Sequence, residues 1–265
     1  GLYLLGLRQE GRVVANIRVC LYTHSQNVIA TRRPSNPRKA DDNIVVISAH
    51  YDSVPAAPGA NDNGSGTAAI MELARILAGY PIKTEIRFLA CGAEEVGLVG
   101  SRYYVARLPE EEKDRILANF NLDMVGTSHD ECDTLYVNTL DGRNLVVEQA
   151  VAAAQRMGLE GVLRAPYHRG ASDHVAFYEV GIPAANFIWR HPVTAALEPV
   201  YHQPYDTISQ NISHERLQVA LSIVGGAVYD LVRLETPSLA RSRIRQPALV
   251  SAEENEEEKF AVEAR

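Results

Sequence analysis

Two adjacent carboxylates, Glu94 and Glu95, directly follow an apolar run in the stretch LACGAEEVGLVGS. Other acids and histidines stand after apolar runs or in the loops between them, at His50, Asp52, Asp62, Asp123, His202 and Asp206. In open α/β sheets, ligands bind beyond the carboxyl ends of the strands. We therefore expect these side chains to meet along one edge of a sheet, where they could bind metal ions.

A cluster of this kind needs cations. Carboxylates brought together without them would have to take up protons or move apart, because like charges disfavour ionisation. Histidine nitrogens combined with carboxylate oxygens suit zinc, and two ions about 3.5–4 Å apart can share one bridging carboxylate. The repulsion between Glu94 and Glu95 is offset if one binds metal and the other faces the metal-bound water. The cluster therefore indicates metal-assisted hydrolysis.

Each residue taken alone has a simpler interpretation. His50 fits a structural hydrogen bond, and Asp123 fits a cap. Glu94 and Glu95 fit the first turn of a solvated helix, because acids favour helix N-termini. The loop NDNGSG fits a turn. The metal-site interpretation depends on all of these residues occurring together, in this order, at strand ends.

The elements that must position these residues follow from the spacing of apolar side chains. The predicted strands are residues 12–21, 25–33, 44–49, 84–92, 118–126, 133–139 and 182–189. The predicted helices are residues 66–80, 101–108, 110–117, 144–158 and 213–235, the last with Ser213 as its N-cap. This alternation predicts an α/β fold with a mixed, mostly parallel central sheet, helices on both faces and an early antiparallel edge.

Composition restricts the classes of protein. The chain has 265 residues, 46% of them hydrophobic, and a net charge of −7, which suits one large α/β domain and argues against nucleic-acid binding. No apolar run approaches membrane-spanning length, and three cysteines without CxxC spacing argue against a disulfide framework. Residues 1–236 are the predicted catalytic domain. Residues 237–265, with their acidic block, are a predicted flexible tail or linker.

Six motifs together resemble one known family: AHYDS, PGANDNGSGTAAIMELAR, ACGAEEVGLVGS, NLDMVG, SDH and YHQPYDT. From about Asn27 to Leu234 the chain resembles the M28 metallopeptidases, the co-catalytic di-zinc aminopeptidases, and within them the bacterial secreted branch. The resemblance implies the zinc-dependent exopeptidase (phosphorylase/hydrolase-like) fold and two Zn²⁺ ions. It also implies an extracellular or cell-envelope location and a protease-associated domain before or near the first residues.

The resemblance implies five metal ligands. His50 and Asp123 would bind one zinc ion, and Glu95 and His202 would bind the other. Asp62 would bridge both ions, and the peptide bond that follows it would be cis, as in relatives. All five positions carry the residue type that the family requires.

Further residues have implied roles around the reaction. Glu94 would take a proton from a metal-bridging water, the resulting hydroxide would attack the first carbonyl of a peptide with a free N-terminus, and Glu94 would protonate the leaving amine. Asp52 would orient His50. Asn63 stands where relatives often have Asp, and we expect little effect because that residue is not a ligand.

The region around SDH is less informative. Some relatives carry a Tyr before it that helps to bind the transition state, whereas YHRGASDH offers Tyr167, His168 or Arg169 near that place, so this role is not carried over. Residues 172–174 themselves would hold the loop or simply begin a helix. Trp189 would be either part of the specificity pocket or a core aromatic.

Other functions of the same fold stay open. A carboxypeptidase would need a cation for the substrate carboxylate, which Arg169 or Arg190 could supply. Removal of an amino acid from a small conjugate is a further alternative. Glutaminyl cyclases of this fold look mononuclear and lack the first histidine, so His50 argues against that reaction. A non-catalytic scaffold or receptor ectodomain would usually have lost ligands, and this chain has lost none.

Overall fold

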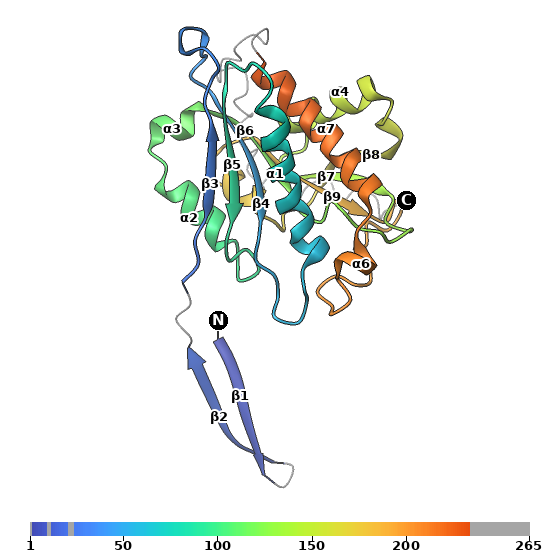
Figure 1. Ribbon diagram of the computed structural model, residues 1–265. Helices are drawn as coiled ribbons and strands as arrows, with labels where there is room; N and C mark the ends of the chain where they lie inside the picture. Colours follow the sequence, from blue (N-terminus) through green and yellow to red (C-terminus); the bar gives the residue numbers. More distant parts are fainter. Residues whose placement is uncertain (1, 10–11, 21–23, 234–265) are drawn as a thin grey trace, which may run out of the picture.

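The computed structural model describes residues 2–9, 12–20 and 24–233 (Figure 1). At its centre is a seven-stranded sheet in the order β3–β5–β4–β6–β9–β7–β8. These strands are β3 (Val28–Arg32), β4 (Ile44–His50), β5 (Glu85–Cys91), β6 (Ile116–Leu122), β7 (Thr134–Thr139), β8 (Leu163–His168) and β9 (Ala184–Arg190). The pairs β3–β5 and β7–β9 are antiparallel and the other four are parallel, which confirms the predicted mixed, mostly parallel sheet with an antiparallel edge.

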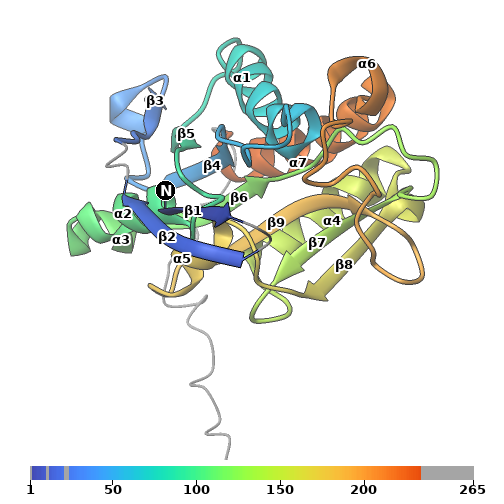
Figure 2. The same ribbon diagram turned by 90° about the horizontal axis from the view of Figure 1, so that it is seen from below.

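Helices cover both faces of this sheet (Figures 1 and 2). One face carries α1 (Gly66–Leu77), α4 (Leu145–Met157) and α7 (His214–Val232). The other carries α2 (Val99–Arg107), α3 (Glu110–Arg115) and α5 (His174–Tyr178), while the short α6 (Ile208–Asn211) precedes α7. α7 begins where the sequence predicted, because the side chain of Ser213 caps it by accepting a hydrogen bond from the N–H of Arg216.

The central strand β4 shows why the sheet could be predicted. All seven of its residues are buried. Successive side chains of a strand point to opposite faces, so Ile44 and Val46 pack with α2 and α5, whereas Val45 and Ile47 pack with α1, α4 and α7. A strand buried on both faces consists of continuous apolar residues, and that is the pattern in the sequence.

Within the central sheet, β6 and β8 differ most from the prediction. β6 begins at Ile116, although residues 116 and 117 were assigned to a helix; Ile116 pairs with Ile44 and is fully buried, so sheet packing outweighs the local helical pattern. β6 also ends at Leu122, before the predicted residue 126. β8 was not predicted at all. It contains Pro166, which argues against a strand except at a sheet edge, and β8 is an edge strand.

The first two strands stand outside the central sheet. β1 (Leu2–Gln9) and β2 (Arg12–Cys20) form an antiparallel pair of their own, of which only β2 was predicted (Figure 1). The tail predicted for residues 237–265 lies outside the described residues and stays a prediction. Among the described residues, no helix has the length and hydrophobicity needed to cross a membrane.

Candidate metal centre

The candidate site lies where three neighbouring parallel strands, β5, β4 and β6, end at the same edge of the sheet. His50 is the last residue of β4, Glu94 and Glu95 follow the end of β5, and Asp123 follows β6. Parallel strands point the same way, so their carboxyl ends deliver these side chains to one place, as the sequence predicted.

Asp62, in the turn before α1, stands between the two histidines. Its Oδ1 lies 3.3 Å from His50 Nε2, and its Oδ2 lies 3.0 Å from His202 Nε2. Each histidine nitrogen also faces a second carboxylate. His50 Nε2 is 3.4 Å from Asp123 Oδ1. His202 Nε2 is 3.1 Å from Glu95 Oε2. The five predicted ligands therefore form two histidine–carboxylate groups that share Asp62.

Asp52 positions the cluster through hydrogen bonds to the backbone of its neighbours. Its Oδ1 accepts a hydrogen bond from the N–H of Glu94 at 3.0 Å, and its Oδ2 accepts one from the N–H of Glu95 at 3.2 Å. His50 Nδ1 lies 3.0 Å from the backbone oxygen of Asp52. A carbonyl oxygen can only accept, so Nδ1 carries the proton of this bond, and Nε2 is directed at the carboxylates. The backbone oxygen of Asp52 thus orients His50, whereas the predicted orienting group, the Asp52 carboxylate, lies 3.6 Å from Nδ1 and instead holds the backbone of both glutamates.

The donor atoms of the cluster fit metal ions. Three buried atoms have no hydrogen-bond partner among the described residues: Glu95 Oε1, Asp123 Oδ1 and His202 Nε2. Buried polar atoms in native proteins are almost always satisfied, and a cation would satisfy these. The mixture of imidazole nitrogens and carboxylate oxygens is the donor set of zinc. Ligand atoms lie within 4.8 Å of one another in two groups, His50 with Asp62 and Glu95, and His50 with Glu94 and Asp123.

In the absence of cations, the cluster retains protons. Burial, together with neighbouring carboxylates, raises the pKa of Glu94 to about 9. Burial and the charge of Asp62 raise the pKa of Glu95 to about 7. Burial alone would lower the pKa of His50, but the surrounding carboxylates of Asp123, Asp52 and Asp62 outweigh it and raise this pKa well above its ordinary value. Protons thus occupy the place that cations would take.

We expect the metal-free protein to lose stability as the pH rises from about 7 to about 8.5, because the folded state then holds protons that the unfolded chain has released. Glu94, with a pKa raised from 4.5 to about 9, and His50, with a raised pKa, both act in this direction. Thermal unfolding after chelation measures the effect. The melting temperature should fall less steeply in Glu94→Gln, and zinc should remove the slope. A flat wild-type profile would contradict this expectation.

Two buried acids fasten the loop that carries Asp62. Asp206 accepts hydrogen bonds from the N–H groups of Asn61 at 2.8 Å and Asp62 at 3.0 Å, and from Asn211 Nδ2 at 2.8 Å. Glu198 Oε1 accepts from the side-chain amides of Asn61 at 3.0 Å and Asn211 at 2.6 Å. The sequence placed Asp206 at the same rim but did not identify Glu198, which has no local signal.

We expect Asp206→Ala to lower the free energy of unfolding by roughly 2–4 kcal/mol and to weaken zinc binding about 10–100-fold. Three donors lose their acceptor in this variant, and Asp62 loses its backbone anchor. Urea denaturation and zinc titration measure the two effects, with the exposed Asp133→Ala as control. Unchanged zinc affinity in a folded Asp206→Ala protein would disprove this positioning role.

Asn63 has a structural role that the sequence did not indicate. The peptide bond between Asp62 and Asn63 is cis, as predicted. The Nδ2 of Asn63 donates to the backbone oxygen of Leu122 at 2.8 Å. Its Oδ1 accepts hydrogen bonds from the N–H groups of Gly66 at 2.9 Å and Met124 at 3.2 Å. The side chain is not placed as a ligand; it joins the Asp62 loop to the end of β6.

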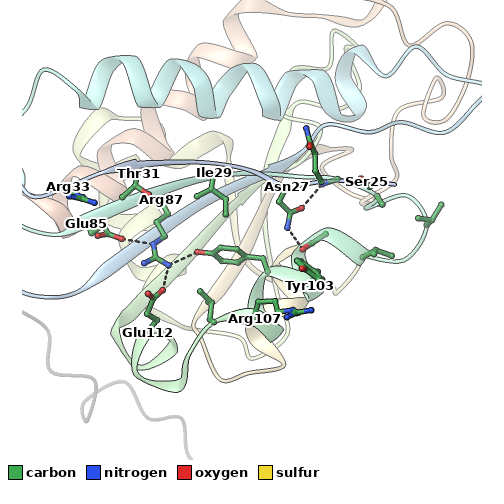
Figure 3. A pocket seen from close by; sticks show the side chains of 18 residues that line it. Ser25, Asn27, Ile29, Thr31, Arg33, Glu85, Arg87, Tyr103, Arg107 and Glu112 are labelled. Carbon is green, nitrogen blue, oxygen red and sulfur yellow. Dashed lines mark hydrogen bonds and ion pairs between the residues drawn. The ribbon is translucent and has the colours of Figure 1, made fainter. Parts of the chain in front are cut away.

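Asn27 fastens the loop that carries the two glutamates. Its Oδ1 accepts a hydrogen bond from the N–H of Gly92 at 3.1 Å, and its Nδ2 donates to the backbone oxygen of Gly100 at 2.8 Å (Figure 3). The two ends of the loop are in such close contact that a Cβ added to Gly100 would lie 2.3 Å from the oxygen of Gly92. Only glycine fits there, so the GLVG part of the motif serves loop closure.

The groove in Figure 3 is larger than the site but chemically different. It has a volume of about 1060 Å³ and lies between β3 and α2, with no histidine or cysteine in its lining. Arg87 within it pairs with Glu85 at 2.8 Å and with Glu112 at 2.7 Å. The groove therefore offers none of the unpartnered ligand atoms found at the strand ends.

Backbone strain gathers around the cluster. Ala93, Met124 and His202 have φ angles of 60°, 59° and 58°, which L-residues rarely adopt. Ala93 precedes Glu94, Met124 follows Asp123, and His202 belongs to the cluster itself. Strain of this kind costs about 1–3 kcal/mol per residue and is typical of functional sites.

Residues 172–174 and Trp189 stabilise the surroundings of the site. Ser172 accepts a hydrogen bond from Asn121 Nδ2 at 2.8 Å, and α5 begins at His174, so the SDH motif both holds its loop and begins a helix. Trp189 is buried in the main core, where its indole N–H donates to the backbone oxygen of Val125 at 3.0 Å. The core interpretation of Trp189 is therefore the correct one.

Comparison with known proteins agrees with the geometry. A family model described as peptidase family M28 matches residues 27–228. The chain belongs to peptidase family M28. It is 49% identical over 230 residues to aminopeptidase YwaD of Bacillus subtilis, an alignment that covers 86% of this chain and 50% of the relative.

Solved structures of M28 relatives share the fold. BSAP, a zinc aminopeptidase from Bacillus subtilis, aligns with a TM-score of 0.75 and 51% identity over 81% of this chain and 52% of its own. An aminopeptidase from Aneurinibacillus sp. strain AM-1 aligns with a TM-score of 0.71 and 44% identity, covering 80% of this chain and 50% of its own. This chain thus spans about half the length of these relatives.

Proposed function

We propose that this chain is the catalytic part of an aminopeptidase that uses two zinc ions to remove the N-terminal residue of peptides. One observation carries the proposal: the two carboxylate oxygens of Asp62 face two different histidines, and each histidine faces a further carboxylate. The relatives named aminopeptidase and zinc aminopeptidase support peptide substrates and zinc.

In the proposed reaction, bound zinc supplies Lewis acidity, which stabilises negative charge on oxygen and makes water more acidic. Glu94 takes a proton from the attacking water and gives it to the leaving amine. Burial and nearby carboxylates give Glu94 a pKa of about 9 without cations, which is a high proton affinity. Bound cations would lower this pKa toward neutrality, where a base can both accept and release a proton. Asp52 keeps His50 and the backbone of Glu94 in place.

The proposed substrates are peptides with a free N-terminus, whose cationic amine suits the acidic rim of the site. A location outside the cell or in the cell envelope, and a protease-associated domain elsewhere in the protein, are proposals that depend on the family resemblance alone. Neither affects the chemistry assigned to the strand ends.

Hydrolysis of leucine p-nitroanilide and of its N-acetylated form tests the proposal. We expect the zinc-loaded protein to cleave the free substrate at least about 100-fold faster than the blocked one, because acetylation removes the cationic amine that suits the acidic rim of the site. Chelation should abolish the activity and added zinc should restore it. Equal cleavage of both substrates, or none of either, would contradict the proposal.

Carboxypeptidase action is the second candidate, and one observation favours it. Arg169 and Arg190 both line the cavity beside the cluster and could bind the terminal carboxylate of a substrate. Cleavage of N-acetylated peptides with a free C-terminus, but not of the same peptides amidated at the C-terminus, would establish this reaction instead.

A further inference from the structure

A small cavity opens beside the metal-ligand cluster. Its volume is about 160 Å³, far below the ~300–1,000 Å³ of sites for drug-sized ligands, so it suits one side chain or chain end. One side of it is formed by the cluster itself. The rest of the lining combines polar and apolar residues, which include Asn138, Arg169, Arg190, Ile188, Leu197 and Tyr201.

Arg190 is a buried cation in this wall. Arg190 is the last residue of β9 and is only 3% exposed. One guanidinium nitrogen, Nη1, donates to the backbone oxygen of Ala195 at 2.9 Å, while Nε has no partner among the described residues. Burial, and then the charge of Arg169, lower the pKa of Arg190 to about 10, so it stays protonated at neutral pH.

Among the described residues, no carboxylate lies close enough to Arg190 to form a direct ion pair with it. The acid that acts on it is Asp123, which faces His50 within the metal cluster. Arg169 lines the same cavity and repels Arg190 rather than compensating it. A buried charge without a partner is costly, and two guanidinium groups at one cavity are the arrangement that binds carboxylates and phosphates.

The amide of Asn138 adds a hydrogen-bond acceptor to the same cavity, which a substrate N–H could satisfy. Asn138 is 2% exposed, lines the cavity, and its Oδ1 has no hydrogen-bond partner among the residues that the structure describes. Ile188, Leu197 and Tyr201 supply apolar surface in the same small space. Together with Arg169 and Arg190, this apolar surface offers a place for a short methylene chain that ends in a negatively charged group.

We propose that this cavity binds a carboxylate of the substrate through Arg190 and Arg169. The inference rests on the proposed peptidase function, because the cavity adjoins the cluster assigned to the reaction. Two substrate groups carry this chemistry, the side chain of an N-terminal Glu or Asp and the C-terminal carboxylate of a dipeptide. Substrates with an N-terminal Lys or Arg side chain are disfavoured, since the charge of that side chain would be repelled by Arg169 and Arg190.

Four dipeptides separate the two sources of the carboxylate. Glu-Ala-amide against Gln-Ala-amide tests the side chain, because the pair differs in charge but hardly in shape. Leu-Ala against Leu-Ala-amide tests the C-terminus. We expect the anionic member of one pair to have a kcat/KM about 10–100-fold higher with the zinc-loaded protein. Ratios near one in both pairs would overturn the inference.

Variants assign the preference to the two arginines. Arg169 is exposed, so the Arg169→Met variant should fold. It should reduce the ratio of kcat/KM values in the preferred pair several-fold. Arg190→Met should bring that ratio close to one. Arg190→Lys keeps a charge and should retain part of the preference. Arg75→Met removes one exposed cation from α1, where Arg75 pairs with Glu72, and serves as the control. A ratio unchanged by both Arg169→Met and Arg190→Lys would overturn the assignment.

A binding readout keeps this test separate from the proposed reaction. In zinc-loaded Glu94→Gln protein, the same four dipeptides should raise the melting temperature, and the anionic member of the preferred pair should raise it more. Adding Arg169→Met should reduce that difference. If wild-type protein hydrolyses none of the peptides, the proposed function fails, yet a charge-dependent shift would still support the cavity assignment. Equal shifts within both pairs would overturn it.

Discussion

Replacement of Glu94 by Gln is expected to lower kcat by about 10²–10⁴-fold, the usual contribution of a general base and acid. Glutamine keeps the shape of the side chain but cannot accept the proton of the attacking water. The backbone at residue 94 should keep its position, because Asp52 accepts a hydrogen bond from its N–H and does not contact its side chain for this purpose. Initial rates with an aminoacyl-anilide measure the loss.

Zinc content distinguishes this result from loss of the metal site. Glu94→Gln protein should bind as much zinc as the wild type, whereas Glu95→Gln should bind less, because Glu95 faces His202 at 3.1 Å. Glu110→Gln, on the exposed side of α3, is the matched control and should change neither quantity. Near-normal turnover in zinc-loaded Glu94→Gln protein would show that another group moves the proton.

Asp62→Ala is expected to weaken zinc binding at both positions by more than the ~10–100-fold typical of residues that only support a ligand. Activity should fall with it. The reason is geometric: Oδ1 lies 3.3 Å from His50 and Oδ2 lies 3.0 Å from His202, so one substitution removes a donor from each group. Titration of the chelated protein with zinc in a calorimeter measures both affinities.

The metal-free Asp62→Ala protein should remain folded. Burial raises the pKa of Asp62, so this carboxyl is a source of strain in the folded state rather than of stability when cations are absent. Asp133→Ala, which removes an exposed carboxylate, is the control for the loss of charge. An Asp62→Ala protein that still binds one zinc ion tightly and remains active would show that Asp62 is not shared.

The sequence predicted the strands that build the site because their physical requirements are local. β4 is buried on both faces, and this forces a continuous apolar run that stands out from its neighbours. The residues after β4, β5 and β6 were recognised because polar side chains directly follow such runs. Local pattern failed at β8, where Pro166 interrupts an edge strand, and at Ile116, where pairing with β4 outweighs helical spacing.

The supports of the site could not be predicted, since they join residues that are distant in the sequence. Asp206 accepts hydrogen bonds from Asn61 and Asp62 across about 145 residues of chain, and nothing next to either position reports the contact. The role of Glu198 could not be predicted for the same reason, because its hydrogen bond with Asn61 also joins distant parts of the chain. The sequence offers Arg190 as a candidate cation for the substrate, but only the structure reveals its burial and its Nε, which has no partner among the described residues.

Anomalous diffraction at the zinc edge, from crystals grown with ample zinc, tests the central claim most directly. Two peaks about 3.5–4 Å apart are expected, one on each side of the Asp62 carboxylate. A single peak, or density at neither His50 nor His202, would contradict a two-ion centre at these strand ends.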